Sequence, residues 1–210
     1  MPRRAALATQ TYDQVDAPLQ ADPEALRALG RQVQDLRAEV ALLKARLAEA
    51  EDLADADVLA PVLNRRAFVR ELERALSALE RYGGYGTLVY FDLDDFKAVN
   101  DRFGHAAGDE ALKAVAARLL AQVRKSDVVG RLGGDEFAVL LDRTGPEGAR
   151  AKAQILRLAI EAEPVRTAGV EIRLKASWGA SELRPGVSAK QSMAEADAAM
   201  FLNKPERGGA

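Results

Sequence analysis

The stretch RLGGDEFAVLL at residues 131–141 places two glycines and two carboxylates directly before an apolar run. The apolar run is typical of a buried strand, and Gly133-Gly134 suits the tight turn of a hairpin. Asp135 and Glu136 would therefore lie where this strand begins.

Another acid, Asp92, falls at the end of the apolar run TLVYFDL at residues 87–93. Because consecutive strands usually lie beside or near each other, Asp92 and Asp135 can reach one edge of the sheet, with Glu136 and Asp94 close behind. Such a carboxylate cluster suits a hard divalent ion such as Mg²⁺, which completes its shell with water and substrate phosphates. The cluster indicates nucleotide chemistry, although Asp135 alone is equally well explained as a turn residue.

The composition excludes several other kinds of site. The 210 residues are 48% hydrophobic and 30% charged, as in a soluble globular protein. With 30 basic and 32 acidic residues the net charge is -2, which gives no overall electrostatic case for nucleic acid or anionic membrane as a partner. The absence of cysteine excludes thiolate chemistry and the single histidine, His105, excludes a histidine-rich metal site. No apolar run reaches the roughly 18 residues of a membrane span, so we expect a cytoplasmic protein.

The apolar pattern divides the chain into three regions. We expect a flexible leader at 1–23, a coiled-coil helix at 24–56 and a globular catalytic domain at 57–210. In the second region the spacing of apolar residues alternates between three and four, at Leu26, Leu29, Val33, Leu36, Val40, Leu43, Leu47 and Ala50. This heptad pattern over residues 26–50 favours a parallel homodimer. The alternative is a lone amphipathic helix, which usually has a wider apolar stripe.

The third region shows helix and strand patterns in the order α-β-α-β-β-α-β-α. The expected elements are a helix at 64–83, a strand at 87–93, helical segments at 94–123 interrupted near Gly104, strands at 127–132 and 136–141, a helix at 146–162, a strand at 170–180 and a helix at 188–204. Asn64 is the expected N-cap of the first helix. This order predicts an α/β domain with a mixed central sheet covered by helices.

Five motifs of this region resemble, in order, those of the GGDEF family, the bacterial diguanylate cyclases. They are LNRRAF at 63–68, FDLDDFKAVNDRFGHAAGDEAL at 91–112, RLGGDEF at 131–137, ASWGA at 176–180 and ADAAMF at 196–201. The resemblance runs from about residue 57 to the end of the chain. It implies the βαββαβ palm fold of nucleotidyl cyclases, preceded here by a long coiled-coil helix.

The resemblance also implies an activity, the condensation of two GTP molecules into cyclic di-GMP with release of two pyrophosphates. Asp92, the backbone carbonyl of Leu93 and Asp135 would hold Mg²⁺ or Mn²⁺. Asp135 would also help to remove the proton of the attacking 3′-hydroxyl, with Glu136 assisting. The ions would neutralise the triphosphate and stabilise the leaving pyrophosphate.

A set of substrate-binding residues follows from the same resemblance: Asn100, Asp109, Lys97, Gly133, Gly134 and Lys204. An amide and a carboxylate can pair with the edge of guanine, the lysines would lie near phosphates, and the glycines leave room for the backbone to approach the nucleotide. Singly, Asn100 is also explained as a helix cap and Asp109 as an acid favoured at a helix N-terminus. His105 is expected to have a structural role.

The segment RKSD at residues 124–127 resembles the family's RxxD product-inhibition site. The guanidinium of Arg124 can donate two hydrogen bonds to a phosphate or to a guanine edge, and Asp127 can accept from guanine nitrogens. Arg131 would help to bind the same product. RxxD alone is a short pattern that also occurs by chance. Its distance from the GGDEF motif predicts feedback inhibition by cyclic di-GMP.

Two motifs depart from the family pattern. Residues 60–62 read Ala-Pro-Val where Thr-Gly-Leu is usual, and Pro61 stiffens the joint before the domain. At the end, Lys204 matches the usual lysine, but Gly208 stands where an arginine is expected, and Arg207 is one position early. Two alternatives to an active cyclase therefore remain: a catalytically weak domain that binds cyclic di-GMP or GTP and signals through its coil, and an interaction protein whose domain is a scaffold.

Overall fold

The computed structural model describes residues 23–204. The predicted leader at 1–23 lies almost wholly outside the described residues, as do Arg207 and Gly208. The chain divides into two units, residues 1–50 and 51–210, which we describe separately. None of the helices between residues 23 and 204 is both long enough and apolar enough to cross a membrane.

Helix α1 (Pro23–Asp55) contains the segment with the heptad pattern. The apolar residues of this pattern are called the heptad seam below. Six of their side chains, at Leu26, Leu29, Val33, Leu36, Val40 and Leu43, are 38% to 56% exposed. A continuous row of exposed apolar side chains normally marks a surface that another element covers. The pairing of two such helices remains a prediction.

The second unit is built around a five-stranded mixed sheet in the order β1-β3-β4-β2-β7. Its strands are β1 (Leu63–Asn64), β2 (Gly86–Leu93), β3 (Val128–Gly133), β4 (Glu136–Asp142) and β7 (Ala176–Glu182). β1 pairs in parallel with β3, while β3, β4, β2 and β7 are antiparallel neighbours. The predicted mixed α/β architecture is confirmed.

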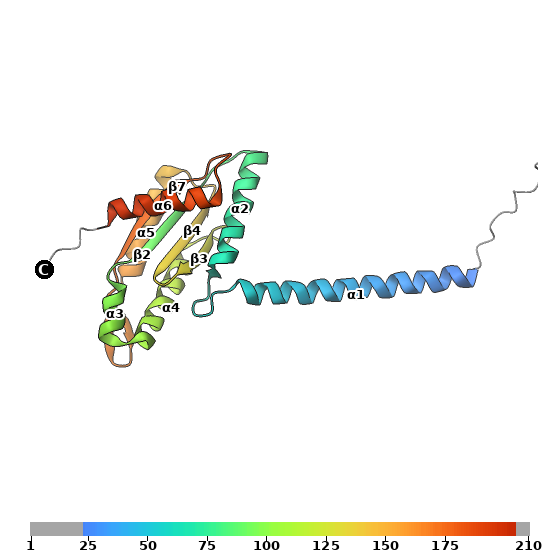
Figure 1. Cartoon of the computed structure of the whole chain (residues 1–210), viewed down its shortest axis with the longest axis horizontal. Coiled ribbons are helices and arrows are strands. Elements are labelled where there is room, and N and C mark those ends of the chain that lie inside the picture. Colours follow the sequence, from blue (N-terminus) through green and yellow to red (C-terminus); the bar gives the residue numbers. More distant parts are fainter. Residues whose placement is uncertain (1–22, 205–210) are drawn as a thin grey trace, which may run out of the picture. The chain divides into compact units, whose positions relative to one another are not determined.

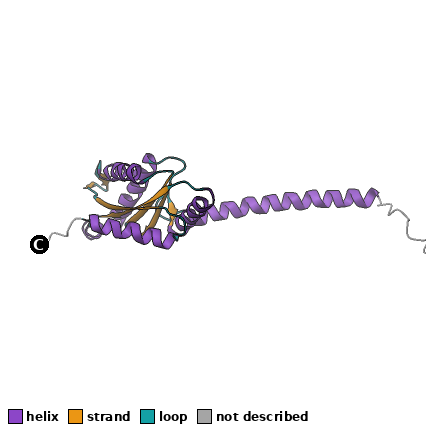
Figure 2. Ribbon diagram, turned by 90° about the horizontal axis from the view of Figure 1, so that it is seen from above, coloured by secondary structure: helices purple, strands orange, loops and turns teal. Residues whose placement is uncertain are grey.

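The helices α2 (Arg65–Tyr82), α3 (Phe96–Phe103), α4 (His105–Gln122), α5 (Pro146–Glu161) and α6 (Ala189–Asn203) surround this sheet. α2 and α6 cover one face, and α4 and α5 cover the other (Figures 1 and 2). Strand β2 shows why both faces are filled, because Leu88 and Tyr90 join the core under α2 and α6, whereas Val89, Phe91 and Leu93 join the core under α4 and α5. This alternation follows from the period of two residues in a strand.

Local sequence explains where the helices begin and end. The side chain of Asn64 accepts a hydrogen bond from the Ala67 N–H at 3.0 Å, so the predicted N-cap of α2 is confirmed. The predicted interruption near Gly104 is also confirmed, because Gly104 has φ 84° between α3 and α4. Only glycine adopts this backbone conformation without strain.

One predicted strand is wrong. Residues 170–180 form two strands instead of one, because β6 (Val170–Ile172) pairs with β5 (Val165–Thr167) in a separate hairpin, and β7 begins only at Ala176. The alternating pattern continues through the break, so it could not show that the two halves belong to different sheets. Gly179 in β7 allows α6 to pack closely, since a Cβ there would lie 2.0 Å from the backbone nitrogen of Met200.

Candidate active site

The carboxylates singled out by their spacing lie at one edge of the sheet. Asp92 near the end of β2 pairs with Glu136 at the start of β4. The next residue, Leu93, donates its N–H to the carbonyl oxygen of Asp135 at 3.3 Å. The antiparallel register therefore brings Asp92 to Asp135 and Glu136, although Asp92 lies more than 40 residues before them in sequence.

The carboxylate of Asp135 lies in an unfavourable place for a negative charge. Burial raises its pKa, and the nearby charge of Asp92 raises it further, while Lys204 and Arg131 act in the opposite direction. Lys204, just after α6, places its Nζ 2.6 Å from Oδ1 of Asp92. The edge thus holds like charges that Lys204 and Arg131 partly offset.

A tyrosine below these carboxylates was missed by sequence reasoning. Tyr90 is only 5% exposed, and this burial is the main cause that raises the pKa of its phenol. The charge of Glu136 and a hydrogen bond to it raise the pKa further. Tyr90 stands two residues before Asp92, so both side chains point to the face covered by α2 and α6. That spacing, together with a hydroxyl inside an otherwise apolar run, was the signal available in the sequence.

The donor set at this edge fits a hard divalent ion. The described residues contain no group of three or more histidines, cysteines, aspartates or glutamates arranged to hold a metal. An ion here would rely on the carboxylates of Asp92 and Asp135, the carbonyl oxygen of Leu93, and oxygen atoms from water or phosphate. Mg²⁺ is commonly bound in this way, through one or two carboxylates and a phosphate-bearing substrate.

The turn at Gly133-Gly134 between β3 and β4, called the signature turn below, is held by Arg131 of β3, which also bonds Asp57 outside the hairpin. Gly134 has φ 36°, within the left-handed region. Its carbonyl oxygen accepts hydrogen bonds from Nε and Nη2 of Arg131, at 3.0 and 2.8 Å. The remaining nitrogen of that guanidinium, Nη1, donates to Oδ1 of Asp57 at 3.0 Å. Asp57 is itself fixed, because Oδ1 also accepts from the N–H groups of Leu59 and Ala60.

These contacts show where the structure places Arg131, which the sequence suggested as a helper of product binding. Its side chain is 14% exposed and supports the turn that carries Asp135. Its part in product binding remains a prediction.

Of the two residues expected to read guanine, Asn100 lies on α3 and Asp109 on α4. A Cβ added to Gly108 would lie 1.9 Å from Oδ1 of Asn100, so the Asn100 side chain lies directly over Gly108. Asp109 follows Gly108 and is exposed. Lys97, in the first turn of α3, and His105, the first residue of α4, are exposed as well.

Arg124 and Asp127 lie far from the carboxylate edge. The Asp127 carboxylate accepts from the N–H of Arg124 at 2.9 Å and from the N–H of Asp142 at 3.2 Å. Asp142 is the last residue of β4 and Glu136 is the first. At about 3.4 Å of rise per residue these ends are about 20 Å apart, so the RxxD segment is separate from the carboxylate site.

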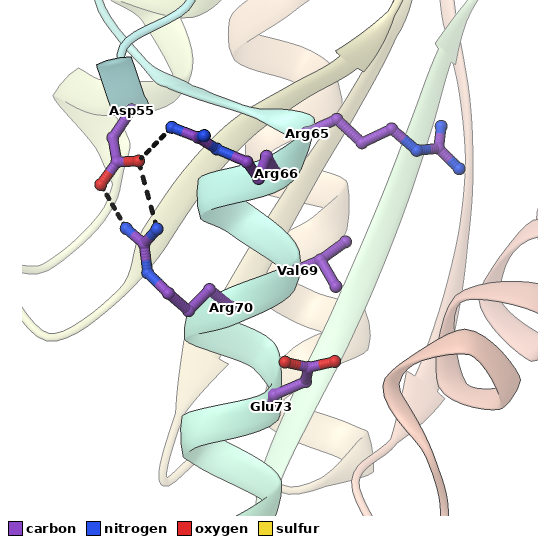
Figure 3. Close-up of a pocket in the computed structure, with 6 residues that line it drawn as sticks. All are labelled: Asp55, Arg65, Arg66, Val69, Arg70 and Glu73. Carbon is purple, nitrogen blue, oxygen red and sulfur yellow. Dashed lines mark hydrogen bonds and ion pairs between the residues drawn. The ribbon is translucent and has the colours of Figure 1, made fainter. Parts of the chain in front are cut away.

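Beside α2 the structure forms a pocket of about 770 Å³ that the sequence did not indicate. Its lining residues are Asp55, Arg65, Arg66, Val69, Arg70 and Glu73 (Figure 3). Asp55 is 8% exposed and bonds Arg70 through both carboxylate oxygens, and Arg66 Nη2 lies 3.4 Å from Oδ1. The hydrogen bond from Arg70 is the main cause that lowers the pKa of Asp55. Arg65 extends to the other side of α2 and donates to the carbonyl oxygen of Leu132 at 3.1 Å.

Comparison with known proteins places these features in a family. The sequence model of the family described as "Diguanylate cyclase, GGDEF domain" matches residues 54–209. Diguanylate cyclase DgcP of Pseudomonas aeruginosa is 33% identical over 179 residues, which are 85% of this chain and 27% of DgcP. Probable diguanylate cyclase DgcE of Escherichia coli is 38% identical over 152 residues, 72% of this chain and 14% of DgcE. The chain thus spans about a quarter or less of these relatives.

Solved structures resemble the chain as well. The diguanylate cyclase SiaD of Pseudomonas aeruginosa, solved in complex with its activator SiaC, superimposes with a TM-score of 0.75 at 28% identity, covering 86% of this chain and 69% of SiaD. The coiled coil and GGDEF domain of DgcB from Caulobacter crescentus, solved with c-di-GMP, gives 0.73 at 29% identity, covering 87% of this chain and 96% of that structure.

The raised pKa of Asp135 predicts a pH-dependent stability difference. In EDTA and without nucleotide, Asp135→Asn should be more stable than wild type at neutral pH. The wild type loses stability as pH rises from the ordinary value of 3.8 through the higher folded-state pKa, and the neutral amide does not. Thermal unfolding of both proteins from about pH 3 to about pH 8 measures this, and the difference should shrink towards acid. A difference that does not change with pH would contradict the assignment.

Proposed function

This chain belongs to the GGDEF family of diguanylate cyclases, and we propose that it condenses two GTP molecules into cyclic di-GMP and releases two pyrophosphates. One observation carries the proposal: the sheet register joins Asp92, the Leu93 backbone and Asp135 at one edge. The contact of Asn100 with Gly108, the residue before Asp109, supports a guanine-binding surface on the same domain.

The residues at the edge have distinct parts in the proposed reaction. Asp92, Asp135 and the Leu93 carbonyl hold Mg²⁺ or Mn²⁺, which when bound would neutralise the triphosphate and acidify the attacking 3′-hydroxyl. The raised pKa of Asp135 makes its carboxylate a better proton acceptor. Glu136 assists at the start of β4. Lys204, already beside Asp92, contributes a positive charge for the phosphates.

Asn100, Asp109 and Lys97 bind the nucleotide in the proposed complex. The Asn100 amide pairs with N3 and the exocyclic amine of guanine, and the Asp109 carboxylate accepts from N1–H and N2–H. Adenine lacks both of these donors, so the pair selects GTP over ATP. Gly133 and Gly134 let the backbone approach the nucleotide, and exposed Lys97 lies near the phosphates.

A single domain of this kind binds one GTP, so synthesis of a cyclic dinucleotide needs two domains that face each other. We propose that the heptad seam of residues 26–50 supplies this by forming a homodimer, which raises the effective concentration of one half-site near the other. In this division residues 24–56 dimerise and residues 57–210 catalyse.

Feedback inhibition is the last part of the proposal. Arg124 and Asp127 form a second site for cyclic di-GMP, about 20 Å along β4 from the carboxylate edge. The two backbone N–H groups that hold Asp127 fix its carboxylate, while Arg124 is exposed and free to accommodate a ligand. Binding here would be measurable apart from catalysis.

A receptor function is the second candidate, favoured by the altered end of the chain. Gly208 replaces an arginine that the family pattern predicts, which removes one charge-assisted phosphate contact. A domain with weak GTP binding would retain the Arg124 and Asp127 site and would report cyclic di-GMP through α1.

The direct test is incubation of nucleotide-free protein with GTP and Mg²⁺, followed by chromatography and mass detection of cyclic di-GMP. We expect product from wild type, and a rate at least about 100-fold lower from Asp135→Ala, because this variant loses a metal ligand. Binding of cyclic di-GMP to Asp135→Ala should be unchanged. Wild-type rates in Asp135→Ala would show that the metal assignment is wrong, and a wild type that binds cyclic di-GMP but makes none would favour the receptor.

The seam predicts how assembly responds to charge. The double variant Leu36→Asp and Leu43→Asp places buried acids at two d positions and should convert the dimer to a monomer with little activity. Light scattering coupled to size-exclusion chromatography measures the mass. Leu42→Asp is the matched control, because Leu42 is 53% exposed but lies outside the seam, and its mass should not change. A double variant with unchanged mass and activity would rule out dimerisation through these residues.

The RxxD segment predicts a change in inhibition without a change in chemistry. Arg124→Ala should raise the cyclic di-GMP concentration for half-inhibition about tenfold or more, since a charge-assisted bidentate contact is lost. Initial rates at low product should stay at the wild-type value because the carboxylate edge is untouched. Steady-state assays with added cyclic di-GMP measure both quantities. Wild-type inhibition of Arg124→Ala would place the inhibitory site elsewhere.

A further inference from the structure

The first residue after β2, Asp94, is bonded to the neighbouring strand β7 and to Lys175, the residue just before that strand. Its backbone N–H donates to the carbonyl oxygen of Lys175 at 2.9 Å. Its carboxylate Oδ1 accepts from the hydroxyl of Ser177 at 2.8 Å. Ser177 is 5% exposed and pairs across the sheet with Asp92. A buried serine thus ties the segment that follows Asp92 and Leu93 to the sheet.

These two bonds fix the direction of the Leu93 carbonyl. The C=O of Leu93 and the N–H of Asp94 belong to one trans peptide and point in opposite directions in its plane. The Asp94 N–H points to β7, so the Leu93 carbonyl points the other way, towards β4. The N–H of Leu93 points to the same side, because it donates to the carbonyl oxygen of Asp135 just before β4. The carbonyl therefore faces the turn that carries the Asp135 carboxylate.

The backbone after Asp94 is strained. Asp95 has φ 53°, in the left-handed region that non-glycine residues seldom adopt, and its side chain makes no capping bond to α3. Such a conformation persists only where the surrounding structure holds it. The bonds of Asp94 to Lys175 and Ser177 supply that restraint immediately before the strained residue.

We propose that Ser177 is a positioning residue for the metal and nucleotide site: its hydroxyl holds the Asp94 carboxylate and thereby keeps the Leu93 carbonyl turned towards Asp135. The identity of the ligand, a divalent ion with GTP, rests on the proposed function. Ser177 itself touches neither. It acts through Asp94, as partners of metal ligands do when they orient a ligand that they do not replace.

A second serine on the same strand provides a matched control. Ser181 is also 5% exposed, and its hydroxyl donates to the Glu195 carboxylate at 2.9 Å. It lies four residues further along β7, next to α6 and away from Asp94. Replacing either serine by alanine removes one buried hydroxyl that donates to a carboxylate, so general effects of that loss should be alike.

The experiment measures binding of Mg²⁺ with 3′-deoxy-GTP, which lacks the attacking hydroxyl, by calorimetry on the full chain. Ser177→Ala should weaken this binding about tenfold and raise the Mg²⁺ concentration for half-saturation, whereas Ser181→Ala should not. Both variants should bind cyclic di-GMP as wild type does. In turnover assays Ser177→Ala should raise KM for GTP more than it lowers kcat.

Asp94→Ala keeps the test valid if Ser177→Ala fails to fold, because it removes the same bond from the loop side. The double variant should bind the nucleotide no more weakly than the weaker single variant, since both changes break one interaction. Wild-type affinity in Ser177→Ala, or equal losses in Ser177→Ala and Ser181→Ala, would overturn the inference. A wild type that binds Mg²⁺ and 3′-deoxy-GTP but makes no cyclic di-GMP would instead refute the proposed function and leave Ser177 testable.

Discussion

The repulsion between two carboxylates at one sheet edge is the constraint on which the rest of this site depends. The register of β2 and β4 brings Asp92 and Asp135 together, and burial together with the charge of Asp92 makes the charge of Asp135 more costly. Lys204, just after α6, offsets the charge of Asp92, and Arg131 both lowers the pKa of Asp135 and holds its turn. A divalent ion would offset the remaining negative charge. The close carboxylates, which destabilise the fold when no ion is bound, are therefore suited to bind a nucleotide with its metal.

The supports of that edge come from distant parts of the chain. Arg131 joins the turn at Gly134 to Asp57, 74 residues earlier, and Ser177 holds Asp94 from 83 residues later. Asp57 follows α1 by two residues, so the end of that helix lies close in sequence to a contact with the signature turn. The turn is therefore connected, through Arg131, both to strand β3 and to the segment that follows α1.

Local patterns in the sequence predicted the parts of this structure that depend on local physics. Strand β2, the break at Gly104 and the cap at Asn64 follow from a continuous apolar run, glycine conformation and capping chemistry. The split of residues 170–180 into β6 and β7 was not predictable, because strand pairing is a tertiary choice. For the same reason the partners of Arg131 and Ser177 carry no local signal. The hydroxyl of Tyr90 stands out within its apolar run, but its interaction with Glu136 depends on strand pairing.

In the proposed reaction, each domain is half of a site for two GTP molecules. Subunit mixing tests it most directly: wild type and Asp135→Ala are combined in varied proportions, subunits are allowed to exchange, and cyclic di-GMP formation is measured per total protein. Each of the two phosphodiester bonds of the product needs its own intact half-site, so a mixed dimer should make no product. Activity should therefore follow the square of the wild-type fraction. Activity proportional to that fraction would show that one domain completes the reaction alone and would contradict the account.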